Sequence, residues 1–403
     1  MSEWKKVKLG EISLNIQTGP FGSQLHQSDY VDTGVPVIMP KDIINGKICD
    51  DTIARISSDL SCKLLKYQVE FEDIIYPRRG DISKCAIVDK NQKGWLCGTG
   101  CLKISIDKSL AKSKFIYYEL QLPKQIGWII NHAIGATMLN LNTNILQNVP
   151  IDLPSINTQN RIAEILSRYD SLIENYQKQI KLLEESAQRL YKEWFVDLRF
   201  PGYENTKIVD GVPEGWEKKR INEFISILSG YAFKSSTFED NGDYNIVTIK
   251  NVQDGFFDGK NLSHIREIPN KMPQHCFLVT GDLLLSLTGN IGRVCMVIGN
   301  NYLLNQRVAK IESDFPAFAY CLFRSENMYT SINNLANGAA QQNVSPIKIG
   351  TLEIVVNNEI ISKFEKVVGS IRNQILVLYS QIDELIEARD RLLPKLMSGE
   401  IEV

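Results

Sequence analysis

The 403-residue sequence lacks a long apolar run. No uninterrupted stretch of about 18 apolar residues occurs, so no helix is expected to span a membrane. The first ten residues, MSEWKKVKLG, also lack the hydrophobic segment of a secretory signal peptide. We therefore expect a chain that makes no contact with a membrane and stays in the cytoplasm.

Metal-binding and catalytic patterns are also missing. The chain has 8 cysteines but no CxxC spacing, and its 4 histidines do not complete a zinc spacing. It has no Asn-Pro-Pro-Tyr sequence of adenine methyltransferases, no glycine-rich cofactor loop after a first strand and no GxxxxGK[ST] sequence. We expect no metal site, no cofactor held by this chain, no catalysis, and reduced, mostly buried thiols.

An excess of positive charge is the third absence. The formal net charge is −2, whereas nucleic-acid affinity comes mainly from basic surfaces that neutralise phosphates. Any nucleic-acid site must therefore be a local one. The content of 43% apolar and 23% charged residues is typical of globular proteins, and the length allows about two or three structural units.

What the sequence does contain is a heptad pattern that occurs twice. Apolar residues in the stretch 159–195 follow one another at alternating steps of four and three, and nine of the ten residues found 202 positions later are apolar again. The first series is Ile162, Leu166, Tyr169, Ile173, Tyr176, Ile180, Leu183, Ala187, Leu190 and Trp194. A sustained period of about 3.5 residues predicts long helices that pair with each other.

The repeat extends beyond these helices. Residues 3–12 return as 215–224, and the β-rich run 73–80 returns as 282–289. The loops of the two copies differ in length, which indicates either changed specificity or neutral drift after duplication. We predict two similar α+β domains, separated by two long antiparallel coiled-coil helices and related by a pseudo-twofold internal repeat. The first domain is predicted over 1–155 and the first long helix over 156–200. A linker without helix or strand follows over 201–213. The second domain is predicted over 214–356 and the second long helix over 357–403.

The antiparallel direction follows from the length of the linker. A helix of about 37 residues rises roughly 55 Å, whereas 13 extended residues reach at most about 47 Å. The linker cannot easily run back along the helix, so the second helix should return antiparallel to the first. Two domains held apart in this way suit two sites on a duplex, although many coiled coils only join domains.

Four sequence stretches resemble the specificity subunit of type I restriction-modification enzymes. They are Gly19-Pro20-Phe21-Gly22-Ser23-Gln24-Leu25, Trp194-Phe195-Val196-Asp197, Val212-Pro213-Glu214-Gly215-Trp216-Glu217 and Leu392-Leu393-Pro394-Lys395-Leu396-Met397-Ser398-Gly399-Glu400. The resemblance covers nearly the whole chain. It implies that each domain is a target-recognition domain that reads one half of an asymmetric bipartite DNA site, while the helices set the spacing and carry the modification subunits.

The resemblance also implies the partners. They are double-stranded DNA, two methyltransferase subunits and, in some systems, restriction and translocase subunits. S-adenosylmethionine is expected in the methyltransferase, which would flip the target base. The alternative function is a non-catalytic two-domain scaffold that binds proteins; the neutral charge favours it and the loop composition disfavours it.

Long polar side chains on loops are the expected DNA contacts, because arginine and lysine bind guanine or phosphate and asparagine and glutamine bind adenine. The candidates are Ser23, Gln24, Lys41, Arg78, Arg79, Lys84, Asn140, Lys234, Ser235, Lys250, Asn251, Thr288, Arg293, Arg307, Gln341, Gln342 and Asn343. Arg78 with Arg79, and residues 341–343, are the preferred base readers. For any one of them, the alternative is an ordinary surface residue, and Gly19, Gly22 and Gly230 can serve simply as turn residues.

The helices carry further apolar residues outside the heptad series, which can dock either a domain of the same chain or a methyltransferase subunit. These residues are Ile165, Leu172, Leu182, Val367, Val377 and Ile386. Arg389 interrupts the second series where the first has Ala187. It either fixes the register of the helix pair or marks frayed packing.

Overall fold

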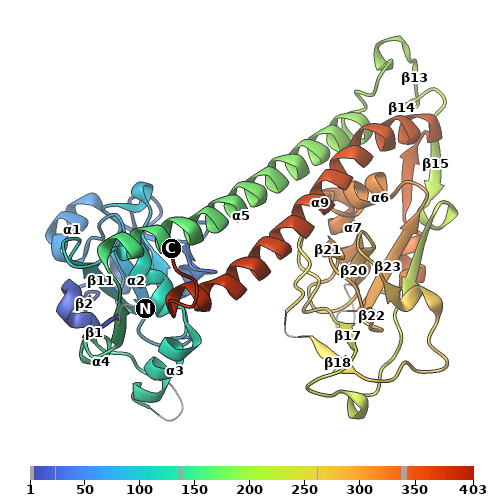
Figure 1. Cartoon of the computed structure of the whole chain (residues 1–403). Coiled ribbons are helices and arrows are strands. Elements are labelled where there is room, and N and C mark those ends of the chain that lie inside the picture. Colours follow the sequence, from blue (N-terminus) through green and yellow to red (C-terminus); the bar gives the residue numbers. More distant parts are fainter. Residues whose placement is uncertain (1–3, 23, 136–138, 261, 337–342) are drawn as a thin grey trace. The chain divides into compact units, whose positions relative to one another are not determined.

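The computed structural model describes residues 4–22, 24–135, 139–260, 262–336 and 343–403 (Figure 1). The chain forms two compact units, one of Met1–Leu172 with Leu385–Val403 and the other of Ile173–Glu384. Within the described ranges, no helix combines the length and hydrophobicity that a bilayer span requires. The two long helices each run through both units, so the domain boundaries drawn from the sequence stay a prediction.

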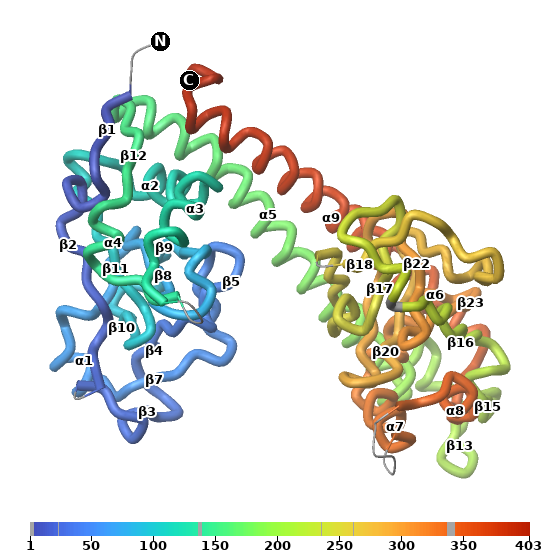
Figure 2. The backbone as a smooth tube through the Cα atoms, turned by 90° about the horizontal axis from the view of Figure 1, so that it is seen from below, coloured from blue at the N-terminus to red at the C-terminus, as the bar shows by residue number. Residues whose placement is uncertain are grey.

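The first unit contains two four-stranded sheets. One is antiparallel and has the order β2 (Ser13–Thr18), β11 (Cys101–Ile106), β8 (Ile74–Pro77) and β9 (Ala86–Ile87). The other has the order β10 (Leu96–Cys97), β4 (Val35–Ile38), β7 (Ala54–Ile56) and β3 (Tyr30–Val31), with β10 and β4 parallel. Two short pairs are β1 (Lys5–Lys8) with β12 (Pro150–Leu153), labelled side by side in Figure 2, and β5 (Ile43–Ile44) with β6 (Lys47–Ile48). The helices are α1 (Ser58–Lys63), α2 (Ser113–Leu120), α3 (Pro123–His132) and α4 (Thr143–Gln147).

The second unit repeats this plan. Its antiparallel sheet has the order β16 (Ile225–Ser229), β23 (Val308–Ser313), β20 (Leu283–Ser286) and β21 (Val294–Met296). Its mixed sheet has the order β18 (Ser263–Ile265), β17 (Tyr244–Val247), β22 (Tyr302–Leu304) and β19 (Phe277–Leu278), with β17 and β22 parallel. The pair β15 (Glu217–Arg220) and β24 (Glu353–Val356) corresponds to β1 and β12. The helices are α6 (Pro316–Phe323), α7 (Glu326–Ala336) and α8 (Pro346–Gly350).

The shared topology confirms the predicted duplicated α+β fold. Both units place one parallel strand pair in a sheet whose other pairings are antiparallel. Both also join an early strand, β1 or β15, to the last strand, β12 or β24, in a separate ladder. Such a combination is unlikely to arise twice from unrelated sequences, because parallel strands need a long connection rather than a hairpin. The core residues repeat as well: Phe115 of α2 and Phe318 of α6 are both completely buried.

The long helices are α5 (Ile156–Tyr191), continued by a π-helical turn at Lys192–Val196, and α9 (Asn358–Met397). In the first unit, Ile162 and Leu166 of α5 share a core with Leu396 of α9. In the second unit, Phe364 of α9 packs against Trp194, with ring centroids 5.7 Å apart. The start of each helix therefore meets the end of the other, which confirms the antiparallel pairing.

Two details of the prediction are corrected. The segment 203–213 is not free of secondary structure: it contains a hairpin of β13 (Ile208–Val209) and β14 (Val212–Pro213), whose turn residues Asp210 and Gly211 have φ of 52° and 79°. Positive φ at both central residues is the geometry that Asp-Gly turns provide. The proline near the end of the second long helix predicts a kink or a stop at Pro394. The helix does not stop there, because α9 includes Pro394 and ends at Met397, two residues before Gly399 with φ of 73°.

Arg389 forms an ion pair across the helices. Its Nη1 lies 2.8 Å from Oδ1 of Asp170 on α5, and its Nη2 lies 2.8 Å from the carboxylate of Asp390. Oδ2 of Asp170 in turn accepts a hydrogen bond of 2.5 Å from the Tyr118 hydroxyl on α2. The arginine therefore has a partner on the opposite helix, as a residue that fixes the register requires, and Asp170 also ties the helix pair to the first domain.

Candidate nucleic-acid interface

Several loops of the first unit meet where β8 ends. The Arg78 amide donates to the Gly100 carbonyl at 2.7 Å, and the Leu141 amide donates to the Arg78 carbonyl at 2.9 Å. Arg79 and Asn140 form an antiparallel bridge. Loops that are distant in sequence are therefore joined by backbone hydrogen bonds. We call the loops around Gly19, Arg78, Gly100 and Asn140 the first loop cluster.

Gly19 joins this cluster because it has no side chain. Its amide donates to the Cys101 carbonyl at 3.0 Å. A Cβ atom built on Gly19 would lie 2.0 Å from the Gly98 carbonyl oxygen, so only glycine fits this close backbone approach. Gly19 and Gly230 are absent from the residues with positive φ, so they do not serve as left-handed turn residues. Their role is close packing of two loops.

The polar side chains of the first loop cluster differ in exposure. Arg79 and Gln24 are exposed, and the Gln24 Oε1 accepts a 2.6 Å hydrogen bond from the Tyr67 hydroxyl. Arg78 is half-buried, and its guanidinium carbon lies 5.1 Å from the ring centroid of Phe21. Asn140 is half-buried too. The structure thus brings these four predicted residues together, whereas Ser23 lies outside the described residues.

Two predicted lysines lie on neighbouring loops. Lys41 is exposed and its ammonium donates to the Thr52 carbonyl at 3.0 Å; it follows Pro40, whose ring would lie 2.9 Å from a Cβ at Gly100. Lys84 is on the β8–β9 connection, with its Nζ 3.7 Å from Asp81. Both ammonium groups therefore make weak surface contacts, Lys41 with Thr52 and Lys84 with Asp81.

The second unit builds the same arrangement. The Leu287 amide donates to the Arg307 carbonyl at 3.1 Å, the Val344 amide donates to the Leu287 carbonyl at 3.0 Å, and Thr288 bridges Asn343. A Cβ on Gly230 would lie 2.3 Å from the Asn305 carbonyl oxygen. We call the loops around Gly230, Thr288, Arg307 and Asn343 the second loop cluster. It has the backbone connections of the first cluster but different side chains.

The predicted residues of the second unit differ in their surroundings. Lys234, Lys250, Arg307 and Asn343 are exposed and Thr288 is half-buried, all on or next to the second loop cluster. Arg293 is half-buried and donates to the side-chain oxygen of Gln253, whose amide binds the Lys250 carbonyl at 2.7 Å, so it also supports a loop. Ser235 begins a 3-10 turn, Ser235–Thr237. Gln341 and Gln342 lie outside the described residues.

The prediction that Asn251 contacts DNA is corrected by the structure. It is only 2% exposed. Its Oδ1 accepts from the amide and hydroxyl of Thr248 at 2.9 and 3.0 Å, and its Nδ2 donates to the carbonyls of Asp258 and Lys260 at 2.9 and 3.3 Å. Since all its hydrogen-bonding positions are used inside the protein, Asn251 holds a loop and cannot read a base.

The predicted partner-binding residues differ in their exposure to solvent. Leu172, Leu182, Val367 and Val377 are exposed apolar side chains on α5 and α9. Ile165 and Ile386 are half-buried, and Ile165 packs against the core of the first unit. Ile165 therefore docks a domain of its own chain, while the four exposed residues remain available to another protein.

The candidates drawn from the sequence do not include Phe21, whose ring lies against Arg78 in the first loop cluster. This side chain is 49% exposed although it is aromatic. A signal was present, because Phe21 lies in the sequence Gly-Pro-Phe-Gly, where a rigid proline precedes it and the short flanking residues offer little surface to cover a ring.

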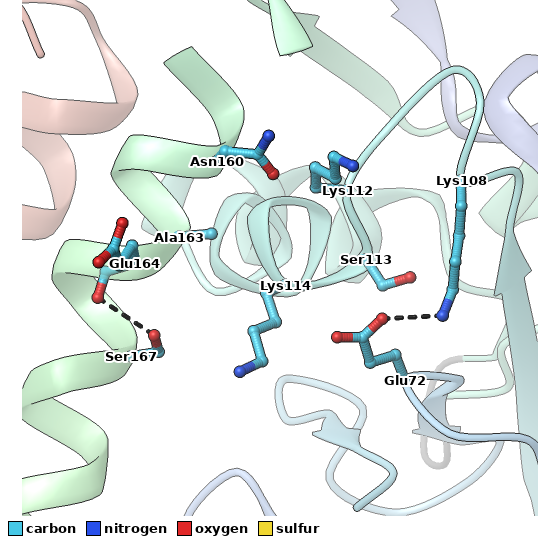
Figure 3. Close-up of a pocket in the computed structure, with 9 residues that line it drawn as sticks. All are labelled: Glu72, Lys108, Lys112, Ser113, Lys114, Asn160, Ala163, Glu164 and Ser167. Carbon is cyan, nitrogen blue, oxygen red and sulfur yellow. Dashed lines mark hydrogen bonds and ion pairs between the residues drawn. The ribbon is translucent and has the colours of Figure 1, made fainter. Parts of the chain in front are cut away.

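A separate cavity of about 500 Å³ opens between the start of α2 and the first turns of α5 (Figure 3). Lys108 and Glu72 face each other there, with an ion pair of 2.9 Å. Glu72 precedes β8, whereas Arg78 follows it, so this cavity lies at the opposite end of the strand. None of the predicted DNA-binding residues lines it.

The described residues contain no group of three or more His, Cys, Asp or Glu side chains that could hold a metal ion. All 8 cysteines are free, and six are buried. Burial raises the pKa of the Cys97 and Cys321 thiols to about 12 each, so both stay protonated at neutral pH. These thiols are packing groups rather than nucleophiles.

Comparison with known proteins gives consistent results. The chain is 26% identical to the type I restriction enzyme MjaIX specificity subunit of Methanocaldococcus jannaschii, over 99% of this chain and 93% of that protein. It is 23% identical to the HindI specificity subunit of Haemophilus influenzae, over the full length of both. A crystal structure of the S subunit from M. genitalium has the same fold, with a TM-score of 0.59 at 17% identity over 98% of this chain and 96% of that one.

A family model described as "Type I restriction modification DNA specificity domain" matches residues 1–185 and again residues 213–361. The two matches cover most of the sequence and correspond to the two copies of the internal repeat. The chain therefore belongs to the type I restriction-modification DNA specificity family.

Proposed function

We propose that this chain is the non-catalytic DNA-specificity subunit of a type I restriction-modification system. The observation that carries the proposal is the pair of loop clusters, built on the same backbone hydrogen bonds but with different polar side chains. A shared backbone with unlike donors and acceptors is what two independent base-reading surfaces require. The target is then an asymmetric bipartite DNA sequence, with one half for each domain.

The chemistry belongs to the partners in this proposal. The chain binds two methyltransferase subunits, which hold S-adenosylmethionine, and restriction and translocase subunits join where the system cleaves DNA. Support comes from the exposed apolar residues Leu172, Leu182, Val367 and Val377 on α5 and α9. Apolar side chains on charged helices are common in protein interfaces.

The test is to co-express the chain with the methyltransferase of its own system and to map methylated adenines across a plasmid by single-molecule sequencing. The expected result is a single bipartite motif that disappears when the specificity chain is omitted. Methylation with no sequence preference, or none at all despite a stable complex, would overturn the proposal and favour a protein-binding scaffold.

A further inference from the structure

Three buried polar atoms of the loop clusters have no hydrogen-bond partner. They are Nε of Arg78 and Oδ1 of Asn140 in the first cluster and Oγ1 of Thr288 in the second, out of six such side-chain atoms among the described residues. A buried polar atom without a partner costs free energy, and native proteins contain few of them. Half of these six atoms thus lie in the two loop clusters, which indicates surfaces that are completed by a polar ligand.

The backbone around Arg78 is held on both sides. Its amide and carbonyl both take part in the hydrogen bonds that join the first loop cluster. In the described part of the chain, no carboxylate lies within ion-pair distance of its guanidinium. The side chain rests instead on the ring of Phe21, with the guanidinium carbon 5.1 Å from the ring centroid. An aromatic face orients a guanidinium without using up its N–H donors.

Phe21 is itself held in place. Gly19 is clamped against Gly98, proline at position 20 limits the backbone, and the Gln24 amide donates to the Phe21 carbonyl at 2.7 Å. The ring cannot easily withdraw into the core from this loop. Its exposed position therefore has a use as a support for Arg78.

We infer that Arg78, oriented by Phe21, reads a guanine in the half-site bound by the first domain. A fixed planar guanidinium matches the O6 and N7 acceptors of guanine, which is the commonest specific arginine contact in the major groove. The neighbouring Arg79 is exposed, and among the described residues no aromatic ring lies against its guanidinium, so it contacts phosphate. The inference rests on the proposed function and adds the base, the reading residue and its positioning residue.

The second domain lacks this device. Leu287 stands where the first domain has Arg78, as the matching hydrogen bonds of Leu141 and Val344 show. The aromatic residue of the corresponding loop, Phe233, is buried against Tyr231, with ring centroids 5.1 Å apart. The guanine contact therefore belongs to one half-site only.

The experiment measures methylation, by the chain in complex with its methyltransferase, of DNA in which each position of the motif is randomised in turn. Arg78→Gln should reduce discrimination at one guanine about 10- to 100-fold and leave the other half-site unchanged. Arg78→Lys keeps the charge but not the planar fork, so it should lose discrimination as well. Arg79→Gln should weaken methylation of all sequences equally.

Phe21 is tested by a matched pair. Phe21→Tyr keeps the aromatic face and should keep discrimination, whereas Phe21→Leu should reduce it at the guanine that Arg78→Gln affects. Unchanged discrimination in Arg78→Gln or Arg78→Lys would overturn the inference, and so would an effect of Phe21→Leu at a different base. Thermal melts identify any variant that is unfolded, and the variants that remain folded then test whether Arg78 reads the guanine. A wild-type complex without any motif would contradict the proposed function instead.

Discussion

Gly19 and Gly22 belong to the same loop but meet different surroundings. A Cβ at Gly19 would collide with the backbone of residues 97–98, whereas one at Gly22 meets nothing within 4 Å. We expect Gly19→Ala to destabilise the chain by about 1–3 kcal/mol, because backbone cannot move aside as a side-chain end can. Gly22→Ala is the control and should change stability little. Urea denaturation measures both, and equal effects would contradict the close packing of the loops.

Asn251 yields a prediction opposite to the one its residue type suggests. Asn251→Ala removes four internal hydrogen bonds and should cost about 1–3 kcal/mol of unfolding free energy. The exposed neighbour Lys250→Ala is the control and should cost little. Methylation mapping of a folded Asn251 variant should return the wild-type motif, and a changed base preference would show that this residue does read DNA.

At the scale of elements, the ion pair between Asp170 and Arg389 gives a measurable coupling. A double-mutant cycle with Asp170→Ala and Arg389→Ala should give about 1 kcal/mol of coupling, because both side chains are about three-quarters buried and lie on facing helices. Tyr118→Phe serves as a second cycle with Asp170, since its hydroxyl binds the other carboxylate oxygen. Coupling near zero for Arg389 would support frayed packing instead.

The exposed apolar residues of the helices give a prediction about assembly. Leu182 is 62% exposed on α5 and Val377 is 50% exposed on α9. Leu182→Glu and Val377→Glu should leave the melting temperature nearly unchanged but weaken binding of the methyltransferase about tenfold or more, because each places a charge in the proposed apolar docking face. Leu14→Glu on β2, where the leucine is 71% exposed, is the matched control. Isothermal titration distinguishes the variants, and equal affinities would exclude this face as the docking site.

At the scale of the whole molecule, each domain has its own core and its own loop cluster. Replacing residues 214–356 with the corresponding segment of a relative should therefore change one half of the methylated motif and leave the other half intact. Single-molecule sequencing of plasmids from the two strains gives the comparison. A change in both halves would show that the domains do not read DNA independently.

The periodic features of the fold could be predicted from the sequence. The heptad series predicted the long helices, the offset of about 200 residues predicted the duplication, and the length of the linker predicted the antiparallel pairing. The hairpin at Ile208–Pro213 was missed, although Asp-Gly is a recognised turn signal, because its strands are only two residues each. The roles of side chains were harder to predict. Asn251 and Gln24 have the same kind of amide group, and only the tertiary structure shows that Asn251 is buried and Gln24 is exposed.

Contacts between residues that are distant in the sequence could not be predicted either, because they also depend on the tertiary structure. The partner of Arg389 lies 219 residues away, and heptad spacing alone does not say which charged residue faces it. The stack of Arg78 on Phe21 likewise depends on how two loops approach each other. Sequence identified Arg78 as a candidate, but its orientation required the structure.

The ion pair of Asp170 with Arg389 also affects whether two copies of this chain can pair through their long helices. In the internal repeat, Arg372 corresponds to Asp170 and Ala187 corresponds to Arg389. If α9 of one copy paired with α9 of another in the same register, Arg389 would face Arg372, and two α5 helices would set Asp170 against Ala187. Only the unlike pair brings opposite charges together. The ion pair therefore favours pairing of α5 with α9 over pairing of either helix with a copy of itself.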